Sequence, residues 1–258
     1  MKDVTAVILA AGESKRMRSS LSKLLHSIGH RSLVEFPVES CVKSGIGRII
    51  VVVGHQSEKI KSILGEGFEY VYQEKRLGTG DAVRKAVPLL KNIKGELVVL
   101  PGDAPFITPS VLKELVYHQR GERPAATVLT AILPDPGYYG RIVRNGYESV
   151  KKIVESRNAS LQELQIKEIN SGIYCFDPQK LLPALFHLKP NQLSKEYYLT
   201  DVIELFFQQG FRVEALRADD PWIAMGVNTP EELKRACEIL KIRSTSLATK
   251  SPRHKGVI

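Results

Sequence analysis

The chain has 258 residues, of which 43% are hydrophobic and 25% charged, and its formal net charge is +9. These values are typical of one large α/β domain or two small ones, and they exclude a wholly disordered or fibrous protein. The longest aliphatic runs have the length of a core strand, whereas a membrane-spanning helix needs about 20 apolar residues. The N-terminal residues also lack the pattern of a secretory signal, so we expect a cytoplasmic protein without a membrane partner.

Cysteine content and charge distribution narrow the class further. Cys41, Cys175 and Cys237 are far apart and form no C-x-x-C motif, so we expect neither a disulfide framework nor a structural zinc site. Residues 241–258 carry +5 of the net charge, which leaves only +4 for residues 1–240. We interpret 241–258 as a flexible, solvated basic tail, and we do not expect a nucleic-acid partner.

The first half of the chain alternates strand-like and helix-like segments. Short aliphatic and β-branched runs ended by turn residues predict strands over residues 4–10, 48–53, 68–72 and 96–100. Apolar residues at helical spacing predict helices over residues 32–44, 57–64 and 79–90. This alternation predicts βαβ units and a Rossmann-like, mainly parallel sheet flanked by helices.

The second half is less regular, and its pattern is more typical of antiparallel strands. Strands are predicted over residues 125–133, 140–143, 150–155, 168–176 and 211–215. Helices are predicted over residues 199–209 and 230–241, the latter with Thr229 as N-cap and Pro230 in the first helical position. No change of composition or Pro/Gly linker divides the chain, so we predict one domain with a β-rich insertion.

The first predicted strand runs into a turn built from small residues, Leu9, Ala10, Ala11 and Gly12. Small side chains allow backbone N–H groups to approach a phosphate or a base closely. Arg16 and Lys23 place two cations beside this turn, as required where charge on a transferred phosphoryl group must be stabilised. Neither a Walker A motif nor G-x-G-x-x-G is present, which disfavours P-loop NTPases and Rossmann dehydrogenases. The alternative is an ordinary tight turn with solvated basic residues.

A glycine-rich segment follows the third predicted strand. Gln73 precedes Leu77, Gly78, Thr79 and Gly80. The glutamine amide offers a donor and an acceptor that can read the edge of a base, and the glycines allow close backbone approach. Taken alone, the segment is more typical of a plain turn in which Thr79 caps the next helix.

Pro101, Gly102 and Asp103 follow the strand predicted over residues 96–100. Ligands of open α/β sheets bind outside the carboxyl ends of the strands. A single hard carboxylate there suits Mg²⁺, which takes further ligands from water and from substrate phosphates. Alternatively, Asp103 caps the helix that begins near Pro109.

In this order, the segments resemble the sugar-1-phosphate nucleotidyltransferases, and in particular the pyrophosphorylase domain of the N-acetylglucosamine-1-phosphate uridyltransferases. The resemblance covers about residues 4–240, and nine segments in the family's order make it highly specific. The matching segments are LAAGESKRM (9–17), SK (22–23), QEKRLGTG (73–80), PGD (101–103), YGRI (139–142), IVE (153–155), EINSGIY (168–174), EYYLTD (196–201) and GVNT (226–229).

The resemblance implies a role for individual residues around a uridine nucleotide, an amino sugar and a metal ion. Gln73 and Gly78 are expected to read the uracil, and Arg16 and Lys23 to face the triphosphate. The full set of expected site residues is Leu9, Ala10, Ala11, Gly12, Gln73, Gly78 and Thr79 for the nucleotide, Arg16, Lys23 and Asp103 for catalysis, Asp103 and Asn228 for Mg²⁺, and Gly102, Gly140, Glu155, Asn170, Tyr197 and Tyr198 for the sugar, which Thr79 is also expected to contact.

Three residues depart from the family pattern. Ser22 stands where proline is usual, Pro101 where tyrosine is usual, and Asp81 where histidine is frequent. We expect these departures to affect the preference for base and sugar more than the reaction type. The chain also lacks the hexapeptide repeats of the family's left-handed β-helix, so neither its acetyltransferase activity nor a trimer built on that β-helix is expected.

The resemblance implies Mg²⁺-dependent transfer of a uridylyl group from UTP to N-acetylglucosamine-1-phosphate, with release of pyrophosphate. The expected domain covers residues 1–240, with a nucleotide-binding part over about 1–110 and a sugar-binding part over about 125–228. One alternative is a transferase of the same fold that uses CTP or GTP, because the Gln73 amide is able to rotate. Another is a non-catalytic nucleotide-sugar-binding protein or a basic RNA-binding domain. The cation and metal-ligand set disfavours the former, and the lack of interleaved aromatic and basic residues disfavours the latter.

Overall fold

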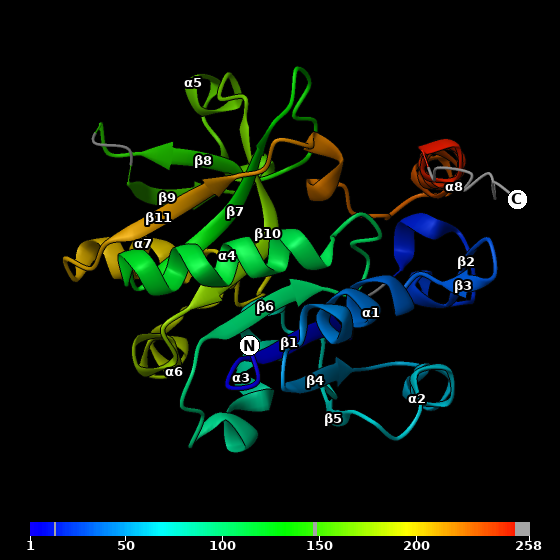
Figure 1. Ribbon diagram of the computed structural model, residues 1–258. Helices are drawn as coiled ribbons and strands as arrows, with labels where there is room; N and C mark the ends of the chain where they lie inside the picture. Colours follow the sequence, from blue (N-terminus) through cyan, green and yellow to red (C-terminus); the bar gives the residue numbers. More distant parts are fainter. Residues whose placement is uncertain (13, 147–148, 251–258) are drawn as a thin grey trace, which may run out of the picture.

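The computed structural model describes residues 1–12, 14–146 and 149–250 (Figure 1). The strands are β1 (Thr5–Ala10), β2 (Ser27–Ile28), β3 (Arg31–Ser32), β4 (Arg48–Val53), β5 (Glu69–Tyr72), β6 (Leu97–Pro101), β7 (Ala126–Ile132), β8 (Arg141–Arg144), β9 (Val150–Val154), β10 (Glu168–Phe176) and β11 (Val213–Arg217). The α-helices are α1 (Glu35–Ser44), α2 (Ser57–Leu64), α3 (Thr79–Leu90), α4 (Pro109–Glu122), α5 (Leu161–Leu164), α6 (Pro178–His187), α7 (Asp201–Gln208) and α8 (Pro230–Lys250). Short 3-10 turns are η1 (Lys15–Met17), η2 (Lys23–Leu25), η3 (Ser156–Asn158) and η4 (Pro221–Ala224).

Each strand and helix predicted from the sequence is present, although several ends shift by one to three residues. The helix expected from residue 32, for example, begins at Glu35, and the strand expected from residue 211 begins at Val213. The sequence pattern did not predict α5, α6 or the short β2–β3 hairpin. Among the described residues, none of the helices is long and apolar enough to cross a membrane.

The main sheet has the order β11-β7-β10-β6-β1-β4-β5, and β8 and β9 extend it beside β10. Neighbours are parallel from β6 through β1 and β4 to β5, as the βαβ pattern predicts. Strand β10 is antiparallel to β6, β7 and β8, and β8 is antiparallel to β9, which confirms the antiparallel character expected of the second half. The edge strand β11 is parallel to β7.

Helices cover both faces of the sheet, which explains why its central strands are apolar throughout. Along β1, Ala6, Ile8 and Ala10 pack into the core on one face, and Val7 packs into the core on the other. Helices α1 and α4 cover the first face and lie side by side across the sheet, and α3, α6 and α7 cover the second (Figure 1). This arrangement leaves the ends of the strands as the accessible edge.

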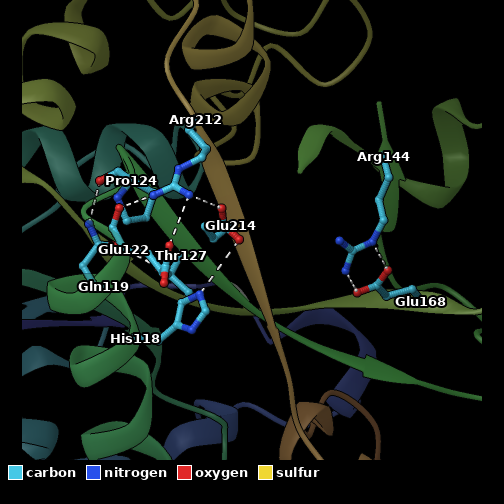
Figure 2. A network of polar contacts seen from close by, with 9 residues as sticks. All are labelled: His118, Gln119, Glu122, Pro124, Thr127, Arg144, Glu168, Arg212 and Glu214. Atoms are coloured by element: carbon cyan, nitrogen blue, oxygen red, sulfur yellow. Dashed lines mark hydrogen bonds and ion pairs between the residues drawn. The ribbon is translucent and has the colours of Figure 1, made fainter. Parts of the chain in front are cut away.

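Polar side chains connect the end of α4 to the strands beneath it (Figure 2). The buried Gln119 donates from Nε2 to the carbonyl of Pro124 at 2.8 Å and accepts at Oε1 from the hydroxyl of Thr127 at 2.7 Å. Because both ends of the amide are bonded, its burial leaves no unpaired polar atom. Nearby, Arg212 forms a partly exposed ion pair with Glu214 at 3.2 Å, which stabilises the edge of the sheet only slightly.

Helix α8 begins as predicted. The backbone N–H of Glu232 donates to Thr229 Oγ1 at 3.2 Å, and Glu232 Oε2 accepts in return from the N–H of Thr229 at 3.1 Å. This reciprocal pair is a capping box, and Pro230 occupies the first helical position, where its missing N–H costs nothing.

The far end of α8 differs from the prediction of a flexible tail over residues 241–258. The helix continues to Lys250, and the guanidinium of Arg243 bonds Asp220 and lies 5.1 Å from the centre of the Phe106 ring. Neither glycine nor proline interrupts the sequence before Pro252, so there was no local signal for an earlier end. Residues beyond Lys250 lie outside the described part of the chain.

Backbone hydrogen bonds join the glycine-rich segment of the first half to a segment of the second. The N–H of Tyr197 donates to the carbonyl of Leu77 at 2.7 Å, and the N–H of Gly80 donates to the carbonyl of Tyr197 at 2.8 Å. The N–H of Leu199 donates to the hydroxyl of Thr79 at 3.0 Å. The predicted capping role of Thr79 is therefore wrong, since no side chain in the described part of the chain caps α3. The hydroxyl of Thr79 instead accepts from the segment that contains Leu199, because this segment packs against the start of α3.

Gly78 should be irreplaceable in this junction, since it has a φ of +96° and an added Cβ would lie 2.5 Å from the carbonyl oxygen of Tyr197. We expect Gly78→Ala to lower the free energy of unfolding by about 2 kcal/mol or more, from backbone strain and this contact together. Urea denaturation followed by circular dichroism measures the loss.

Gly65→Ala is the matched control. Gly65 has nearly the same backbone conformation, with φ +84° and ψ −170° against +96° and 178°, but its Cβ would meet nothing within 4 Å. The difference between the two variants isolates the contact with Tyr197. Equal losses would show that this contact adds nothing to stability.

Candidate functional site

A cavity of about 340 Å³ opens at the carboxyl ends of the parallel strands. Figure 1 shows the arrowheads of β4 and β6 pointing to this same side of the molecule. A larger cavity of about 760 Å³, around Gln119 and Arg120, lies away from the motif residues. The smaller cavity is the candidate site, because residues from distant segments converge there. Its lining includes Leu9, Ala11, Gly12, Lys23, Gln73, Gly78, Thr79, Pro101, Asp103, Glu196 and Tyr198.

Lys23, Asp103 and Asn228 meet at one point beside this cavity. The Lys23 ammonium donates to Asn228 Oδ1 at 2.7 Å and also forms a salt bridge with Asp103 Oδ2. Both charged side chains are largely buried, with 14% of Lys23 and 10% of Asp103 exposed. An added Cβ on Gly226 would lie 3.5 Å from Asp103 Oδ2, so glycine leaves space beside the carboxylate. Two hard oxygens thus converge on a single cation.

Asp103 does not cap the following helix, which was the alternative interpretation. Helix α4 is capped by Thr108, whose hydroxyl accepts from the N–H of Val111 at 3.4 Å. The backbone carbonyl of Asp103 instead accepts from the N–H of Val227 at 3.1 Å. This bond brings the loop of Asn228 next to the end of β6.

The loop before Lys23 is fixed by side chains that the motif did not indicate. The N–H of Lys23 donates to Ser14 Oγ at 2.6 Å, and the N–H of Ser22 donates to Gln56 Oε1 at 2.8 Å. Ser22 has φ −55° and ψ 138°, close to the conformation that proline imposes. Serine therefore preserves the backbone of the usual proline, and it adds a hydrogen bond that proline cannot make.

Arg16 lies exposed on η1 and is not among the residues that line the cavity. The charges of Arg16 and Asp103 both act on the hydroxyl of Tyr139, so Arg16 lies within electrostatic reach of the site. A neighbouring cavity of about 310 Å³ is lined mainly by serine hydroxyl groups and His55. It shares Gly12 and Arg76 with the cavity that contains Lys23 and Gln73. The loop that carries Arg16 passes beside this second space.

Ala10 and Gly102 are not among the residues that line the cavity. The Ala10 side chain is buried in the core, on the opposite face of β1 from the cavity-lining Leu9 and Ala11. The N–H of Gly102 donates to the carbonyl of Leu9 at 2.9 Å, and a Cβ there would come within 3.1 Å of the same oxygen. Glycine thus allows the chain after β6 to run close to β1.

Gln73 directly follows β5 and is only 3% exposed, yet it lines the cavity. Its Nε2 donates to the carbonyl of Gly78 at 3.1 Å and to Asp81 Oδ2 at 2.8 Å. Asp81 lies in the first turn of α3 and is 4% exposed. A helix N-terminus stabilises a negative charge, which offsets part of the cost of burying this carboxylate.

Gly140 and Asn170 lie next to one another but outside the cavity lining. The N–H of Asn170 donates to the carbonyl of Gly140 at 2.9 Å, and Asn170 Nδ2 donates to the hydroxyl of Tyr174 at 2.7 Å. A shift in register between β10 and β7 falls between Asn170 and Tyr174, where Gly172 has a φ of +77°. This bulge redirects the strand next to the carboxyl end of β6. Tyr198 does line the cavity, and its hydroxyl lies 2.6 Å from Ser194 Oγ.

Glu155 and Asp201 form an acidic pair near Tyr198. Burial raises the pKa of Glu155, whose carboxylate accepts a hydrogen bond from Thr200 Oγ1 at 3.3 Å. Burial, together with the charge of Glu155, raises the pKa of Asp201 to about 6. Strongly perturbed carboxylates are concentrated at functional sites. Sequence reasoning assigned no role to Asp201, although it ends the EYYLTD segment.

Tyr139 is a second residue that sequence reasoning passed over. Its hydroxyl accepts from the N–H of Gly226 at 3.3 Å, and burial raises its pKa to about 12. It stands at the start of the YGRI segment, which was the available signal. Its contact with the Gly226 loop supports the backbone on which Asn228 stands.

Comparison with known proteins identifies the family of the chain. A family model described as the MobA-like NTP transferase domain matches residues 6–163. The bifunctional protein GlmU of Acetivibrio thermocellus is 44% identical over 243 residues, which cover 94% of this chain and 53% of that protein. GlmU of Geobacillus thermodenitrificans is 44% identical over 238 residues, which cover 92% of this chain and 52% of that protein. The chain thus spans about half the length of these relatives.

A solved structure shares the fold. A UDP-glucose pyrophosphorylase complexed with UDP-glucose superposes with a TM-score of 0.76 over 93% of this chain and 98% of that one, at 18% sequence identity. The likeness confirms the expected α/β architecture, a mainly parallel sheet flanked by helices. With the family match over more than half of its residues, the chain belongs to the MobA-like NTP transferase family and is a nucleotidyltransferase.

Proposed function

We propose that the chain transfers a uridylyl group from UTP to N-acetylglucosamine-1-phosphate and releases pyrophosphate. The observation that carries the proposal is the meeting of Lys23, Asp103 and Asn228 beside a cavity that also contains Gln73. A cation and metal-binding oxygens stand next to a group that is able to read a base. The motif resemblance extends through both halves of the chain and supports the choice of UTP and an N-acetylated sugar.

In the proposed reaction, a phosphate oxygen of the sugar-1-phosphate forms a bond to the α-phosphorus of UTP. The bond from this phosphorus to the bridging oxygen breaks, and pyrophosphate leaves with the electron pair. Such transfer needs no protein nucleophile, because positioning and electrostatic stabilisation lower most of the barrier. Lys23 lines the cavity and offers a positive charge for the negative charge that develops on the phosphates.

Mg²⁺ fits the residues present, and Asp103 and Asn228 would hold it. Their carboxylate and amide oxygens already converge on the ammonium of Lys23, a cation in the position that a metal would take. The described residues contain no group of three or more His, Cys, Asp or Glu able to hold a metal. An ion here would therefore take its remaining ligands from phosphate and water, as Mg²⁺ does. When bound, Mg²⁺ would neutralise charge on the phosphates.

Gly140, Glu155, Asn170 and Tyr198 are proposed to bind the amino sugar. Glu155 and Tyr198 are next to the junction that joins the two halves, and Asn170 is next to the end of β6. A site that hydrogen-bonds a substrate group rejects analogues without that group, because its own polar atoms then stay unpaired. The acetamido group of the sugar is the feature that these polar side chains are proposed to recognise.

A panel of nucleotides and sugar-1-phosphates, followed by pyrophosphate release, tests the proposal. We expect the highest kcat/KM for UTP with N-acetylglucosamine-1-phosphate, by about a hundredfold or more over glucose-1-phosphate. Equal turnover of the two sugars would overturn the assignment of the sugar. Absence of turnover with every pair would overturn the reaction.

Asp103→Asn keeps the shape of the side chain and removes its charge. We expect kcat to fall by about 10²-fold or more, because the metal loses the carboxylate of the proposed pair. We also expect a folded protein with a lowered melting temperature, because Lys23 loses its charged partner. Asp219→Asn, the same change at an exposed position, serves as the control. Wild-type kcat in Asp103→Asn at limiting Mg²⁺ would contradict the metal assignment.

Lys23→Ala gives a readout that does not depend on turnover. Since the Lys23 ammonium occupies the oxygens proposed for the metal, we expect Lys23→Ala to bind Mn²⁺ more tightly than wild type in the absence of nucleotide. Electron paramagnetic resonance of free Mn²⁺ measures the affinity, with the exposed Lys59→Ala as control. In the transfer reaction the same variant should lose about 10²-fold in kcat. Unchanged Mn²⁺ affinity would show that Lys23 does not compete with the metal in solution.

A further inference from the structure

Asp81 is a buried carboxylate behind the cavity that neither the fold nor the proposed reaction uses. It is 4% exposed and, unlike its partner Gln73, is not part of the cavity lining. Its Oδ2 accepts from Gln73 Nε2 at 2.8 Å. The same nitrogen donates to the carbonyl of Gly78 at 3.1 Å. Both hydrogens of the Gln73 amide are therefore bonded to protein acceptors.

This arrangement fixes the orientation of the amide. An ionised carboxylate and a backbone carbonyl are acceptors only, so neither could bond the amide oxygen in the reversed orientation. A reversed amide would bring Oε1 against Asp81 Oδ2 and leave two buried acceptors without a donor, which is costly at low exposure. Within the described part of the chain, the side-chain hydrogen bonds of Gln73 involve Nε2, so the atom left to interact with a ligand is Oε1.

We propose that Asp81 is a positioning residue that holds Gln73 Oε1 toward the cavity and thereby selects a nucleotide whose base presents a ring N–H. Uracil has such a donor at N3, whereas cytosine has a lone pair at N3. In the same pose, uracil would donate to Oε1, and cytosine would place an acceptor against an acceptor. The inference rests on the proposed nucleotide site and specifies its base preference. Thymine shares the N3–H with uracil, so this contact does not separate the two.

The direct test compares the binding of UTP and CTP to wild type and to Asp81→Asn, without any sugar phosphate. In wild type we expect UTP to bind at least about tenfold more tightly than CTP, the size of one hydrogen bond replaced by a buried acceptor clash. An asparagine at position 81 is able to donate as well as accept, so only the carbonyl of Gly78 still disfavours the reversed Gln73 amide. The UTP:CTP affinity ratio should then fall.

Two further variants separate positioning from a general structural role. Asp81→Glu retains an acceptor-only carboxylate and should restore part of the UTP preference. Glu74→Gln removes the same charge from an exposed neighbour of Gln73 and should leave the ratio unchanged. A merely structural role for Asp81 predicts that Asp81→Asn weakens UTP and CTP equally, at an unchanged ratio, and that result would overturn the proposal.

The wild-type measurement and Asp81→Glu still test the proposal if Asp81→Asn fails to fold. Equal affinity of wild type for UTP and CTP would overturn the proposal without any variant. Because this binding test contains no sugar phosphate, its outcome is separate from that of the sugar panel. A strong UTP preference that depends on Asp81, combined with no transfer to any sugar phosphate, would uphold the base inference and reject only the proposed reaction.

Discussion

The ammonium of Lys23 is the point on which the site depends. It bonds Asp103 after β6 and Asn228 before α8, residues that lie 80 and 205 positions further along the chain. Removing either partner would leave a charge unpaired in a largely buried place, which is expensive. The bridge therefore draws the β1 loop, the end of β6 and the approach to α8 to one point. Everything proposed for phosphate and metal chemistry follows from this convergence.

The second constraint is the backbone junction between the two halves. The segment around Gly78 and the segment around Tyr197 exchange backbone hydrogen bonds. They lie so close together that a Cβ added to Gly78 would lie 2.5 Å from the carbonyl oxygen of Tyr197. One side of this junction carries Gln73 and Thr79, and the other carries Tyr198 and Thr200, which bonds Glu155. The groups proposed for nucleotide and for sugar are thus held at a fixed separation, as transfer between two bound substrates requires.

Buried polar pairs set the chemical character of the cavity as much as the residues that face it. Gln73 faces the cavity, but Asp81 behind it determines which amide atom is available. Ser22 replaces a usual proline, and the Gln56 side chain takes up the N–H that this change exposes. In both cases a departure from the family pattern is matched by a specific hydrogen bond.

The sequence by itself determined the alternation of strands and helices and the α/β class, because the periodicity of apolar residues and the turn residues are local properties. It also indicated that Gln73 and Asp103 follow strands of one parallel sheet, since the carboxyl ends of such strands share one edge. Only the tertiary structure decided that Arg16 stays outside the cavity, that Thr79 bonds Leu199 rather than capping α3, that α8 continues to Lys250, and that Asp81 orients Gln73. Each of these depends on how distant segments pack, and that packing is set by the whole core rather than by any short stretch of sequence.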